Sequence, residues 1–437
     1  MGKMQKLNYD VMGLGLGPSN IALAVCFEEL LAEQKCFTLG FAERNQSVKW
    51  HGGLLLPWSV SQVSFLKDLA TLRNPKSDFT FLNYLHQTGR MDDFINLGTF
   101  TPFRSEISDY LAWAGEKTIS SQKHFDHECV EIKGVEKEGR VGSWNVTFAN
   151  GAEAETRDLV VSVGRDLNIP AEFRDIQDGL VIHSENYLHE IAKFKGRKGL
   201  RVAIIGAAQS AAEVFKAVHS DLEDCRPTVI MRKAGFRYYD TSPYLNELFQ
   251  PEYIDKFYNM SHQSRQDILS QMHSANYSGL APYLLDDLYR MQYRERLEGH
   301  EVSRVLTMRQ IVKATQSSDE VALELRETTS GDVSTEVFDL VILGTGFKNR
   351  LPELMDGVRD HIATDGVAEF FISRDYQVDL KENVDAGIYL QGLSESTHGI
   401  ADTLLSNLAH RSDRIVRSLI ARRKSQKGAT RAAVAAE

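Results

Sequence analysis

The sequence has few of the residues that build metal centres and redox-active disulfides. Its 437 residues include only four cysteines, at positions 26, 36, 129 and 225, and no two of them form a Cys-x-x-Cys pair. A His-Glu-x-x-His motif and clusters of Asp and His are also missing from the sequence. We therefore expect no bound metal and no redox disulfide, and we interpret the four cysteines as reduced, buried thiols.

The chain also lacks an excess of positive charge and any long apolar run. Its formal net charge of −10 argues against a surface for nucleic acid or anionic membranes. No segment resembles a signal peptide, and no apolar run approaches the roughly 20 residues of a transmembrane helix. We expect a soluble, cytoplasmic protein, and 42% hydrophobic residues are enough for two or three domains.

Two glycine-rich turns are the most informative features that are present. Each follows a short apolar strand, at 9–12 and 200–205, and opens a helix, at 18–25 and 209–218. Such a turn lets backbone N–H groups and a helix N-terminus approach a pyrophosphate. One turn of this kind is equally typical of a tight loop, but two in register predict two bound dinucleotides.

The residues at the ends of the next strands distinguish the two sites. The strand at 37–42 ends at Glu43, a carboxylate that can accept hydrogen bonds from both hydroxyls of an adenosine ribose, as in FAD or NAD. The strand at 228–231 ends at Arg232 and Lys233, a cationic pair that suits a 2′-phosphate. The first site therefore favours FAD and the second NADPH.

The order of these segments predicts an α/β fold with two dinucleotide-binding, Rossmann-like domains, the NADPH domain inserted in the FAD domain. Strand-like pieces at 130–132 and 144–148 indicate a β-meander, and apolar strands at 158–163 and 339–343 share a glycine ending. We expect the FAD domain at 1–195 and 340–420, the NADPH domain at 196–339, a helical substrate-binding part at about 245–298, and a tail at 421–437 that is a frayed helix or disordered.

Several longer motifs closely resemble one enzyme family. They are residues 15–24 (Gly-Leu-Gly-Pro-Ser-Asn-Ile-Ala-Leu-Ala), Trp50-His51-Gly, residues 62–75, residues 79–85, Gln209-Ser-Ala-Ala-Glu213 and Asp402-Thr-Leu-Leu-Ser406. The chain resembles the L-ornithine N5-monooxygenase / L-lysine N6-monooxygenase family, the flavin-dependent N-hydroxylating enzymes of siderophore biosynthesis, from about residue 8 to 418. Within this family the ornithine enzymes are the most similar.

The resemblance implies that NADPH gives a hydride to FAD, that the reduced flavin takes up O2 as a C4a-hydroperoxide, and that a side-chain amine attacks its distal oxygen. The cofactor carries the difficult chemistry. The implied product is N5-hydroxyornithine for a hydroxamate siderophore, made by a homo-oligomer. L-Lysine and the diamines putrescine and cadaverine stay open as substrates, because one methylene is worth only about 1 kcal/mol in a pocket. A non-catalytic sensor that binds flavin and NADP is the alternative from another class.

The resemblance also implies the residues of three sites, none of them a catalytic acid or base. The FAD site comprises Gly13, Gly15, Gly17, Pro18, Ser19, Glu43, Lys49, Trp50, His51, Gln62, Cys129, Thr403, Leu404 and Leu405. The NADP site comprises Gly206, Ala207, Ala208, Gln209, Ser210, Arg232, Asn276, Tyr277 and Ser278. The substrate site comprises Lys67, Asn246, Glu247, Leu248, Phe249, Asn276 and Ser406.

Lys67 is of interest because Val63, Leu66 and Ala70 would share its face of a helix. A lysine on an apolar stripe is either a snorkelling side chain paired with an acid or, as the resemblance implies, the counter-ion of the substrate's α-carboxylate. Asparagines such as Asn246 are otherwise turn or cap residues. A free alkyl ammonium has a pKa near ~10.4, so the site must also favour the neutral amine.

Two further features concern helix N-termini. The segment 392–402 reads as a loop entering a helix that continues through Leu405 and Ser406, whose N-terminus would place positive potential beside the flavin. His398 in this loop is interpreted as a cap or loop residue. In the second glycine turn, Ala208 stands where members of the family usually carry a glycine that lets the backbone approach the pyrophosphate, so we expect weaker NADPH binding than in an Ala208→Gly variant.

Overall fold

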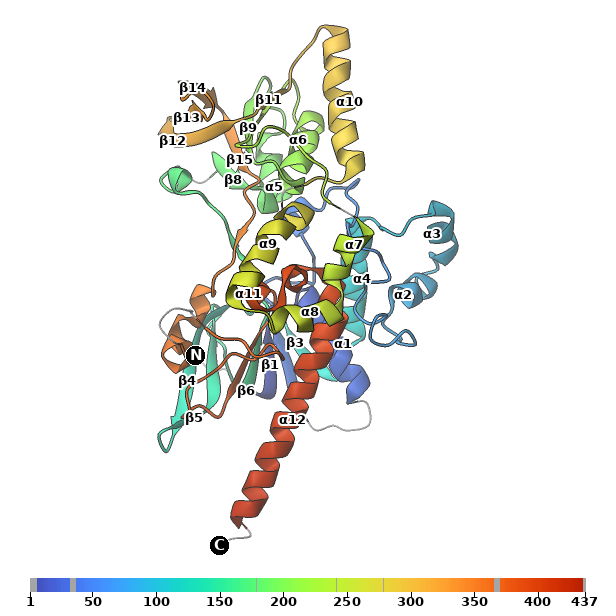
Figure 1. Ribbon diagram of the computed structural model, residues 1–437, viewed down its shortest axis with the longest axis vertical. Helices are drawn as coiled ribbons and strands as arrows, with labels where there is room; N and C mark the ends of the chain where they lie inside the picture. The colour runs from blue at the N-terminus through green and yellow to red at the C-terminus, as the bar shows by residue number, and fades with distance from the viewer. Residues whose placement is uncertain are drawn as a thin grey trace.

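The computed structural model describes residues 6–31, 37–177, 179–240, 242–277, 279–364 and 370–434, with the backbone alone described for 274–276 and 426–434. Two bodies lie one above the other along the long axis, each built around its own sheet (Figure 1). The mixed α/β character and the parallel sheets confirm the predicted fold class. Within the described residues, no helix is both long and apolar enough to cross a membrane.

The lower body contains a seven-stranded sheet. Its parallel part has the order β3-β2-β1-β6-β17 and consists of β3 (Ser121–His124), β2 (Leu39–Ala42), β1 (Leu7–Leu14), β6 (Glu153–Val161) and β17 (Gly387–Leu390). The first half of β6 also pairs with β5 (Arg140–Phe148), which pairs with β4 (Cys129–Lys137), both antiparallel. This pair is the predicted β-meander.

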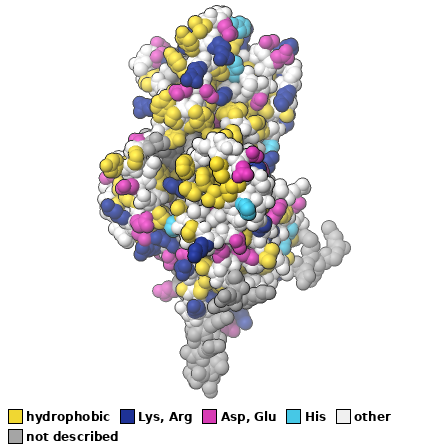
Figure 2. Space-filling view, turned by 90° about the vertical axis from the view of Figure 1, so that its right-hand side faces the viewer, with side chains coloured by type: hydrophobic (Ala, Val, Ile, Leu, Met, Phe, Trp, Pro, Cys, Tyr) yellow, Lys and Arg dark blue, Asp and Glu magenta, His cyan; other side chains and the backbone are white. Residues whose placement is uncertain are grey.

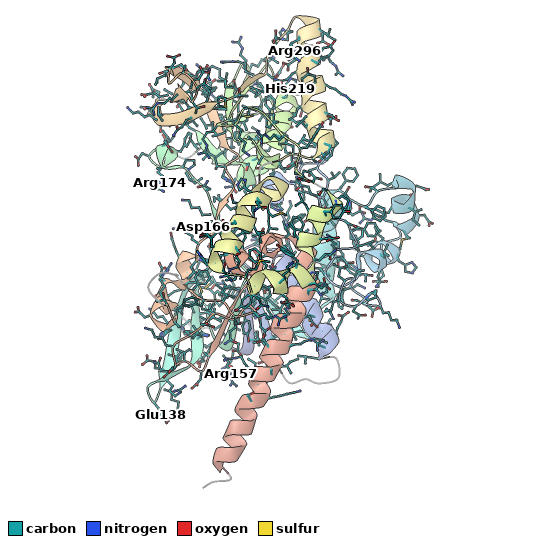
Figure 3. All side chains as sticks on the ribbon, in the orientation of Figure 1. Glu138, Arg157, Asp166, Arg174, His219 and Arg296 are labelled. Atoms are coloured by element: carbon teal, nitrogen blue, oxygen red, sulfur yellow. The ribbon has the colours of Figure 1, made fainter. Side chains whose placement is uncertain are left out.

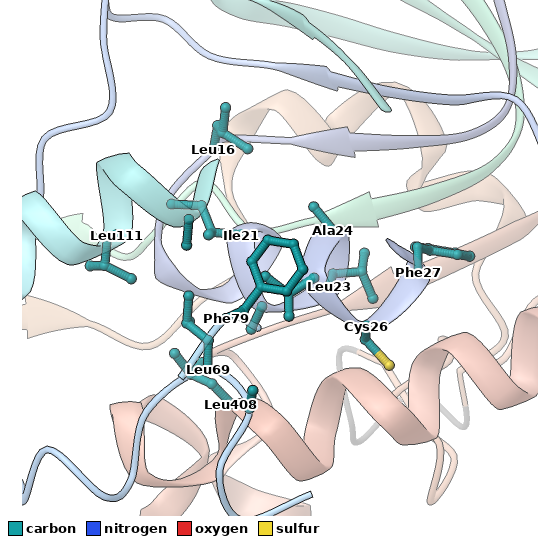
Figure 4. Close-up of a cluster of buried hydrophobic side chains, with 14 of the residues drawn as sticks. Leu16, Ile21, Leu23, Ala24, Cys26, Phe27, Leu69, Phe79, Leu111 and Leu408 are labelled. Atoms are coloured by element: carbon teal, nitrogen blue, oxygen red, sulfur yellow. The ribbon is translucent and has the colours of Figure 1, made fainter. Parts of the chain in front are cut away.

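Helices cover the parallel part of this sheet and form the largest core. They are α1 (Pro18–Leu30), α4 (Arg104–Lys117) and α12 (Leu408–Val434), and α1 packs against both of the others. Apolar side chains from α1, the segment 69–79, α4 and the start of α12 meet in one cluster (Figure 4). Because α1 is buried along most of its length, the glycine turn in front of it is held rigidly at the end of β1.

The upper body contains a five-stranded parallel sheet of order β11-β10-β9-β15-β8. The strands are β11 (Arg304–Leu306), β10 (Arg226–Ile230), β9 (Arg201–Ile205), β15 (Leu340–Leu343) and β8 (Val181–His183). Helices α6 (Gln209–Asp221) and α10 (Pro282–Glu298) pack together, and β12 (Arg309–Ser317), β13 (Glu320–Glu327) and β14 (Val333–Phe338) form an antiparallel sheet. The short α5 (Tyr187–Glu190) follows β8.

Strands from both sides of the expected domain boundaries at 195/196 and 339/340 pair in the upper sheet. Strands β8 and β15 belong to the upper sheet, so the upper unit begins before Val181 and extends past Leu343. The chain passes between the two bodies in two segments, which contain β7 (Asp166–Leu167) and β16 (Phe347–Lys348), and these two strands pair with each other. Asp166, between the two bodies in Figure 3, bonds Arg350 at 2.6 Å. Strands of both sheets carry the same apolar pattern and glycine ending, so the sequence pattern alone does not assign them to one sheet or the other.

The segment around Lys67 is not the helix that we expected. Residues 62–78 form turns and bends, and helices resume at α2 (Phe81–Gln87) and α3 (Met91–Leu97). The carboxylate of Asp68 accepts the backbone N–H groups of Ala70, Thr71 and Phe81 at 2.6–2.9 Å. An aspartate that binds nearby backbone donors in this way competes with helix hydrogen bonds, so the apolar spacing was misleading.

The segment at about 245–298, for which we expect a helical substrate-binding part, contains helices that divide between the two bodies. Helices α7 (Pro243–Asn246), α8 (Pro251–Tyr258) and α9 (His262–Asn276) reach the lower body, where α8 and α9 contact α11 (Glu395–His398), whereas α10 stays on the upper body. The C-terminal segment differs from the prediction, because single 3-10 turns at 400–403 and 405–407 precede α12. The tail is helical through Val434.

Candidate functional site

A cavity of about 1890 Å³ connects the two bodies and reaches both glycine turns. Pockets for drug-sized ligands measure roughly 300–1,000 Å³, so this space is large enough for more than one such molecule. Most of the predicted FAD residues line it, namely Gly15, Gly17, Pro18, Ser19, Glu43, Lys49, Trp50, His51, Gln62, Cys129, Thr403, Leu404 and Leu405. The predicted NADP residues Gly206, Ala207, Ala208, Gln209, Ser210, Arg232 and Tyr277 line the same cavity.

The first turn is shaped by its glycines in three different ways. Gly15 has φ +79°, and a Cβ there would lie 2.6 Å from the carbonyl oxygen of Ser162. A Cβ at Gly17 would meet no protein atom within 4 Å, because it would point into the cavity. Gly13 does not line the cavity: a side chain there would overlap the ring of Phe41, so this glycine serves helix–strand packing rather than ligand contact.

The second turn repeats this geometry with one substitution. Gly206 has φ +146°, and a Cβ there would collide with the carbonyl oxygen of Gly344, as one at Gly15 would with Ser162. Ala208 is the N-cap of α6 with φ −112° and ψ −179°, close to the φ −84° and ψ −173° of Gly17 at the N-cap of α1. Ala208 is therefore the equivalent of Gly17 in the second turn, and its methyl group takes the direction that a Cβ at Gly17 would take into the cavity.

Glu43 lies at the end of β2 as predicted and is almost fully buried. Its Oε2 accepts the backbone N–H of Leu16 at 2.7 Å, and its Oε1 accepts the backbone N–H of Asn45 at 3.0 Å. These bonds fix the carboxylate at the mouth of the first turn. An acidic group held in this place suits the two hydroxyls of an unphosphorylated ribose.

Positive charge collects at the corresponding place of the upper sheet. Arg232 and Lys233 follow β10 and line the cavity together with Arg309. Burial lowers the pKa of Lys233, and the nearby charges of Arg237 and Arg232 lower it further. Cations that repel one another in this way favour an anionic group, such as a 2′-phosphate, between them.

Sequence reasoning missed an arginine beside the first turn. Arg411 of α12 is 1% exposed, lines the cavity, and donates to the hydroxyl of Ser19 at 2.7 Å and to Gln391 at 3.1 Å. It also pairs with the buried carboxylate of Asp402. A fixed positive charge here adds to the N-terminal end of α1 in favouring a pyrophosphate.

Two polar side-chain contacts join the bodies at the cavity. His51 has φ 51°, and its Nδ1 lies 2.9 Å from Oε1 of Glu185. Arg104 of α4 pairs with the fully buried Glu213 of α6, and Gln209 donates to the same carboxylate at 2.7 Å. The first contact connects the part of the wall that carries Trp50 and His51 to the upper body, and the second connects α4 to α6.

Most of the predicted substrate residues lie away from the cavity wall. Lys67, Asn246, Glu247, Leu248, Phe249 and Ser406 are not among the residues that line the cavity. Leu248 and Phe249 pack on the cluster of Met272 and Ile400, whereas Asn246 and Glu247 are exposed. The Ser406 hydroxyl is buried and bonds no described atom, and the side chain of Asn276 and all of Ser278 lie outside the described residues.

Lys67 is half-buried, and no ion pair of its ammonium group is seen among the described residues, so both interpretations of this lysine stay open. His398, by contrast, is fully buried and stacks on Tyr376 with 4.0 Å between ring centroids. Burial lowers the pKa of His398 to about 4. It is therefore a neutral structural residue that packs the C-terminal segment.

With this geometry established, the comparisons with known proteins are decisive. The family model described as L-lysine 6-monooxygenase/L-ornithine 5-monooxygenase matches residues 7–349. The chain belongs to this family. The resemblance noted in the sequence is thereby confirmed.

Individual relatives match nearly the whole chain. The L-ornithine N(5)-monooxygenase of Pseudomonas aeruginosa PAO1 is 36% identical over 419 residues, which cover 94% of this chain and 93% of that protein. The solved structure of a Kutzneria sp. 744 ornithine N-hydroxylase with reduced FAD, NADP+ and L-ornithine is 33% identical, with a TM-score of 0.90 and coverage of 95% and 100%. An L-lysine 6-monooxygenase structure from Pseudomonas syringae is 30% identical, with a TM-score of 0.84 and coverage of 95% and 99%.

Proposed function

We propose that the protein catalyses the NADPH- and FAD-dependent N-hydroxylation of the side-chain amine of L-ornithine, giving N5-hydroxyornithine for a hydroxamate siderophore. The observation that carries the proposal is one cavity that joins two glycine turns, with an acidic residue after the strand beside the first turn and cations after the strand beside the second. The ornithine specificity is supported by the relatives at 36% and 37% identity, which are both ornithine enzymes.

The residues of the first turn fit FAD. The space in front of Gly17 suits a pyrophosphate, with Ser19 and the buried Arg411 beside it, and Glu43 suits the adenosine ribose. Trp50, His51 and Gln62 would line the remainder of the group. When bound, the flavin supplies the redox chemistry that activates O2.

The residues of the second turn fit NADPH, the source of the hydride. The N-terminus of α6 behind Ala208 would hold the pyrophosphate, and Arg232 would bind the 2′-phosphate. The pairs His51–Glu185 and Arg104–Glu213 would keep the two nucleotides in one orientation, because each joins the lower body to the upper one. Such fixed orientation is the main contribution that a protein makes to a bimolecular step.

The chain's remaining tasks concern the substrate. Lys67 would bind the α-carboxylate, and the unsatisfied hydroxyl of Ser406 would accept or donate a hydrogen bond to the amino acid. The amine must lose its proton before it attacks, and a site that excludes water would favour the neutral form. The orientation of the amine, rather than a dedicated base, is then the protein's contribution.

The proposal is tested by incubating the FAD-loaded protein with NADPH, L-ornithine and isotopically labelled O2, and by analysing the product by mass spectrometry. We expect N5-hydroxyornithine that carries one labelled oxygen atom for each NADPH consumed. Consumption of NADPH with hydrogen peroxide as the only oxygen product would contradict the proposal, and a protein that binds both nucleotides without consuming NADPH would be the sensor.

We also propose that the protein forms a homo-oligomer in the cytoplasm. Hydrophobic side chains gather across the middle of the face shown in Figure 2. Large apolar side chains that are exposed include Leu82 at 41%, Phe100 at 65% and Tyr244 at 84%. Exposed apolar surface of this kind favours an interaction site, and a second copy of the chain is the partner that we propose. Light scattering on the purified protein tests the assembly, and cell fractionation tests the location.

A further inference from the structure

Glu395, at the start of α11, lies where three distant segments meet at the cavity wall. Its Oε1 accepts the hydroxyl of Tyr277, which ends α9, at 2.8 Å. The same hydroxyl lies 3.0 Å from Oγ1 of Thr403. All three residues line the cavity, and no sequence motif had assigned a role to Glu395.

The directions of these two hydrogen bonds follow from the number of protons available. A carboxylate only accepts, so Tyr277 uses its single hydroxyl proton on Glu395. The contact with Thr403 is then one in which the threonine hydroxyl donates and Tyr277 accepts. The result is an ordered chain from Thr403 through Tyr277 to Glu395, with Glu395 as its terminal acceptor.

Charged and titratable groups surround this carboxylate from several elements. Arg165, which follows β6, has its guanidinium 5.9 Å from the ring centre of Tyr277 and 5.2 Å from that of Phe347. Asp402 lies on the turn that precedes Thr403, and the ring of His273 on α9 lies 5.9 Å from that of Tyr277. Burial raises the pKa of Glu395, and the Tyr277 hydrogen bond and the charge of Arg165 oppose this shift.

The chain of hydrogen bonds connects parts that belong to different bodies. Helix α9 comes from the helical part inserted in the upper unit, whereas Glu395 and Thr403 belong to the C-terminal return of the lower unit. The other described contacts of α9 with this segment are apolar and centre on Met272 and Ile400, while Asp255 of the preceding α8 pairs with Arg374 and Arg414. Apolar contacts are not directional, so the hydrogen bonds determine where the end of α9 stands.

We propose that Glu395 is a positioning residue for the N-hydroxylation: as the terminal acceptor for Tyr277, it fastens the end of α9 to the segment 395–403 and keeps the cavity wall closed beside the reacting amine. The inference rests on the proposed function. When the fastening is lost, water enters and O2 is reduced without oxygen transfer, so that NADPH, a proton and O2 become NADP+ and H2O2. The consequence is uncoupling rather than slower flavin reduction.

The test compares Glu395→Ala, Glu395→Gln and Tyr277→Phe with the parent enzyme. We expect Glu395→Ala to raise the substrate KM roughly tenfold, the effect of losing one hydrogen bond to a charged group. The hydroxylated product per NADPH should fall and H2O2 should rise, while the anaerobic rate of flavin reduction by NADPH stays within about twofold of the parent. Tyr277→Phe removes only the hydroxyl, so the product formed per NADPH should fall as in Glu395→Ala even if the alanine variant folds poorly. Because Tyr277 also belongs to the predicted NADP site, the comparison of flavin-reduction rates is made with the Glu395 variants alone.

Glu395→Gln distinguishes a positioning role from a requirement for charge. The amide oxygen of Gln can still accept from Tyr277, so coupling should return to near the parental value. Ser396→Ala, an exposed neighbour on α11, is the matched control and should couple normally. Parental coupling in Glu395→Ala, or a glutamine variant as uncoupled as the alanine variant, would overturn the proposal.

Hydrogen exchange makes the test independent of the hydroxylation itself. In the resting protein, the amides of α9 should exchange at least about threefold faster in Glu395→Ala than in the parent or in Ser396→Ala. If the parent forms no hydroxylated amine but this difference is present, the proposed function fails and the fastening stands. If the parent hydroxylates and α9 exchanges equally in all variants, the fastening is refuted.

Discussion

We predict that the methyl group of Ala208 weakens the binding of NADP+. The first glycine turn of the same molecule, which has Gly17 at the equivalent position, provides the comparison. Gly17 and Ala208 occupy the same N-cap position with nearly the same backbone angles. A Cβ at Gly17 would project into open cavity, and Ala208 carries such a Cβ. We therefore expect Ala208→Gly to let the pyrophosphate of NADP+ approach the N-terminus of α6 more closely.

The size of the effect follows from the hydrogen bond that the methyl group lengthens. A bond between a backbone N–H and a phosphate oxygen is charge-assisted, and weakening one such bond costs about 1.4 kcal/mol, or tenfold in Kd. The φ of −112° is open to any residue, so stability should change little. Glycine is the better N-cap by roughly 0.5 kcal/mol, while alanine restricts the unfolded chain by about as much.

Isothermal titration of NADP+ into the FAD-loaded protein measures the effect directly. Ala208→Gly should lower the Kd about tenfold, and the FAD content should stay unchanged. Ala207→Gly is the matched control, because Ala207 packs against the buried apolar cluster of the upper body that includes β9 and α6, so the loss of its methyl group should not tighten binding. The reciprocal Gly17→Ala should lower FAD retention with the fold intact. Equal or weaker NADP+ binding by Ala208→Gly would refute the reasoning.

Three further predictions concern single side chains. Glu43→Gln should lower FAD affinity roughly tenfold in a fluorescence titration, because one amide oxygen cannot accept from both backbone donors that Glu43 now binds; unchanged affinity would contradict the assignment. Arg232→Ala should raise the KM for NADPH about tenfold or more and leave that for NADH unchanged, whereas an equal loss for both would place the 2′-phosphate elsewhere. Because the pKa of His398 is lower in the folded protein, the unfolded chain binds a proton on this histidine more readily. The free energy of unfolding should therefore fall as pH drops from about 6.5 towards 4, and at pH 5 it should be about 2 kcal/mol below its value at pH 7. Urea unfolding at pH 7 and pH 5 measures this difference in the free energy of unfolding. The difference should shrink in His398→Gln and stay unchanged in His300→Gln, which replaces an exposed histidine. An equal difference in the parent and both variants would exclude His398 as the cause.

The sequence predicts best what depends on local pattern. A strand, a glycine turn and a helix are determined within about 20 residues. For this reason both turns, and the positions of Glu43 and Arg232 after the next strands, were predicted from sequence alone. The helix expected around Lys67 failed for an equally local reason, because Asp68 binds backbone N–H groups that a helix would have used.

Contacts between distant segments could not be predicted in this way. Arg411 meets Ser19 across 392 positions, and Tyr277 meets Glu395 across 118 positions. The spacing of residues along the chain carries no signal for such pairs. Their side chains come together only because α12 returns beneath the first turn and α9 crosses from the upper unit to the lower one.

The most direct test of the account is the turnover of L-ornithine, L-lysine and putrescine by the FAD-loaded protein with NADPH and O2. Hydroxylated product and H2O2 are quantified for each amine. We predict that L-ornithine gives N5-hydroxyornithine in near-stoichiometric yield with NADPH and the highest kcat/KM of the three. If L-ornithine gives only H2O2 while putrescine or L-lysine gives the hydroxylamine, the assignment to ornithine is contradicted.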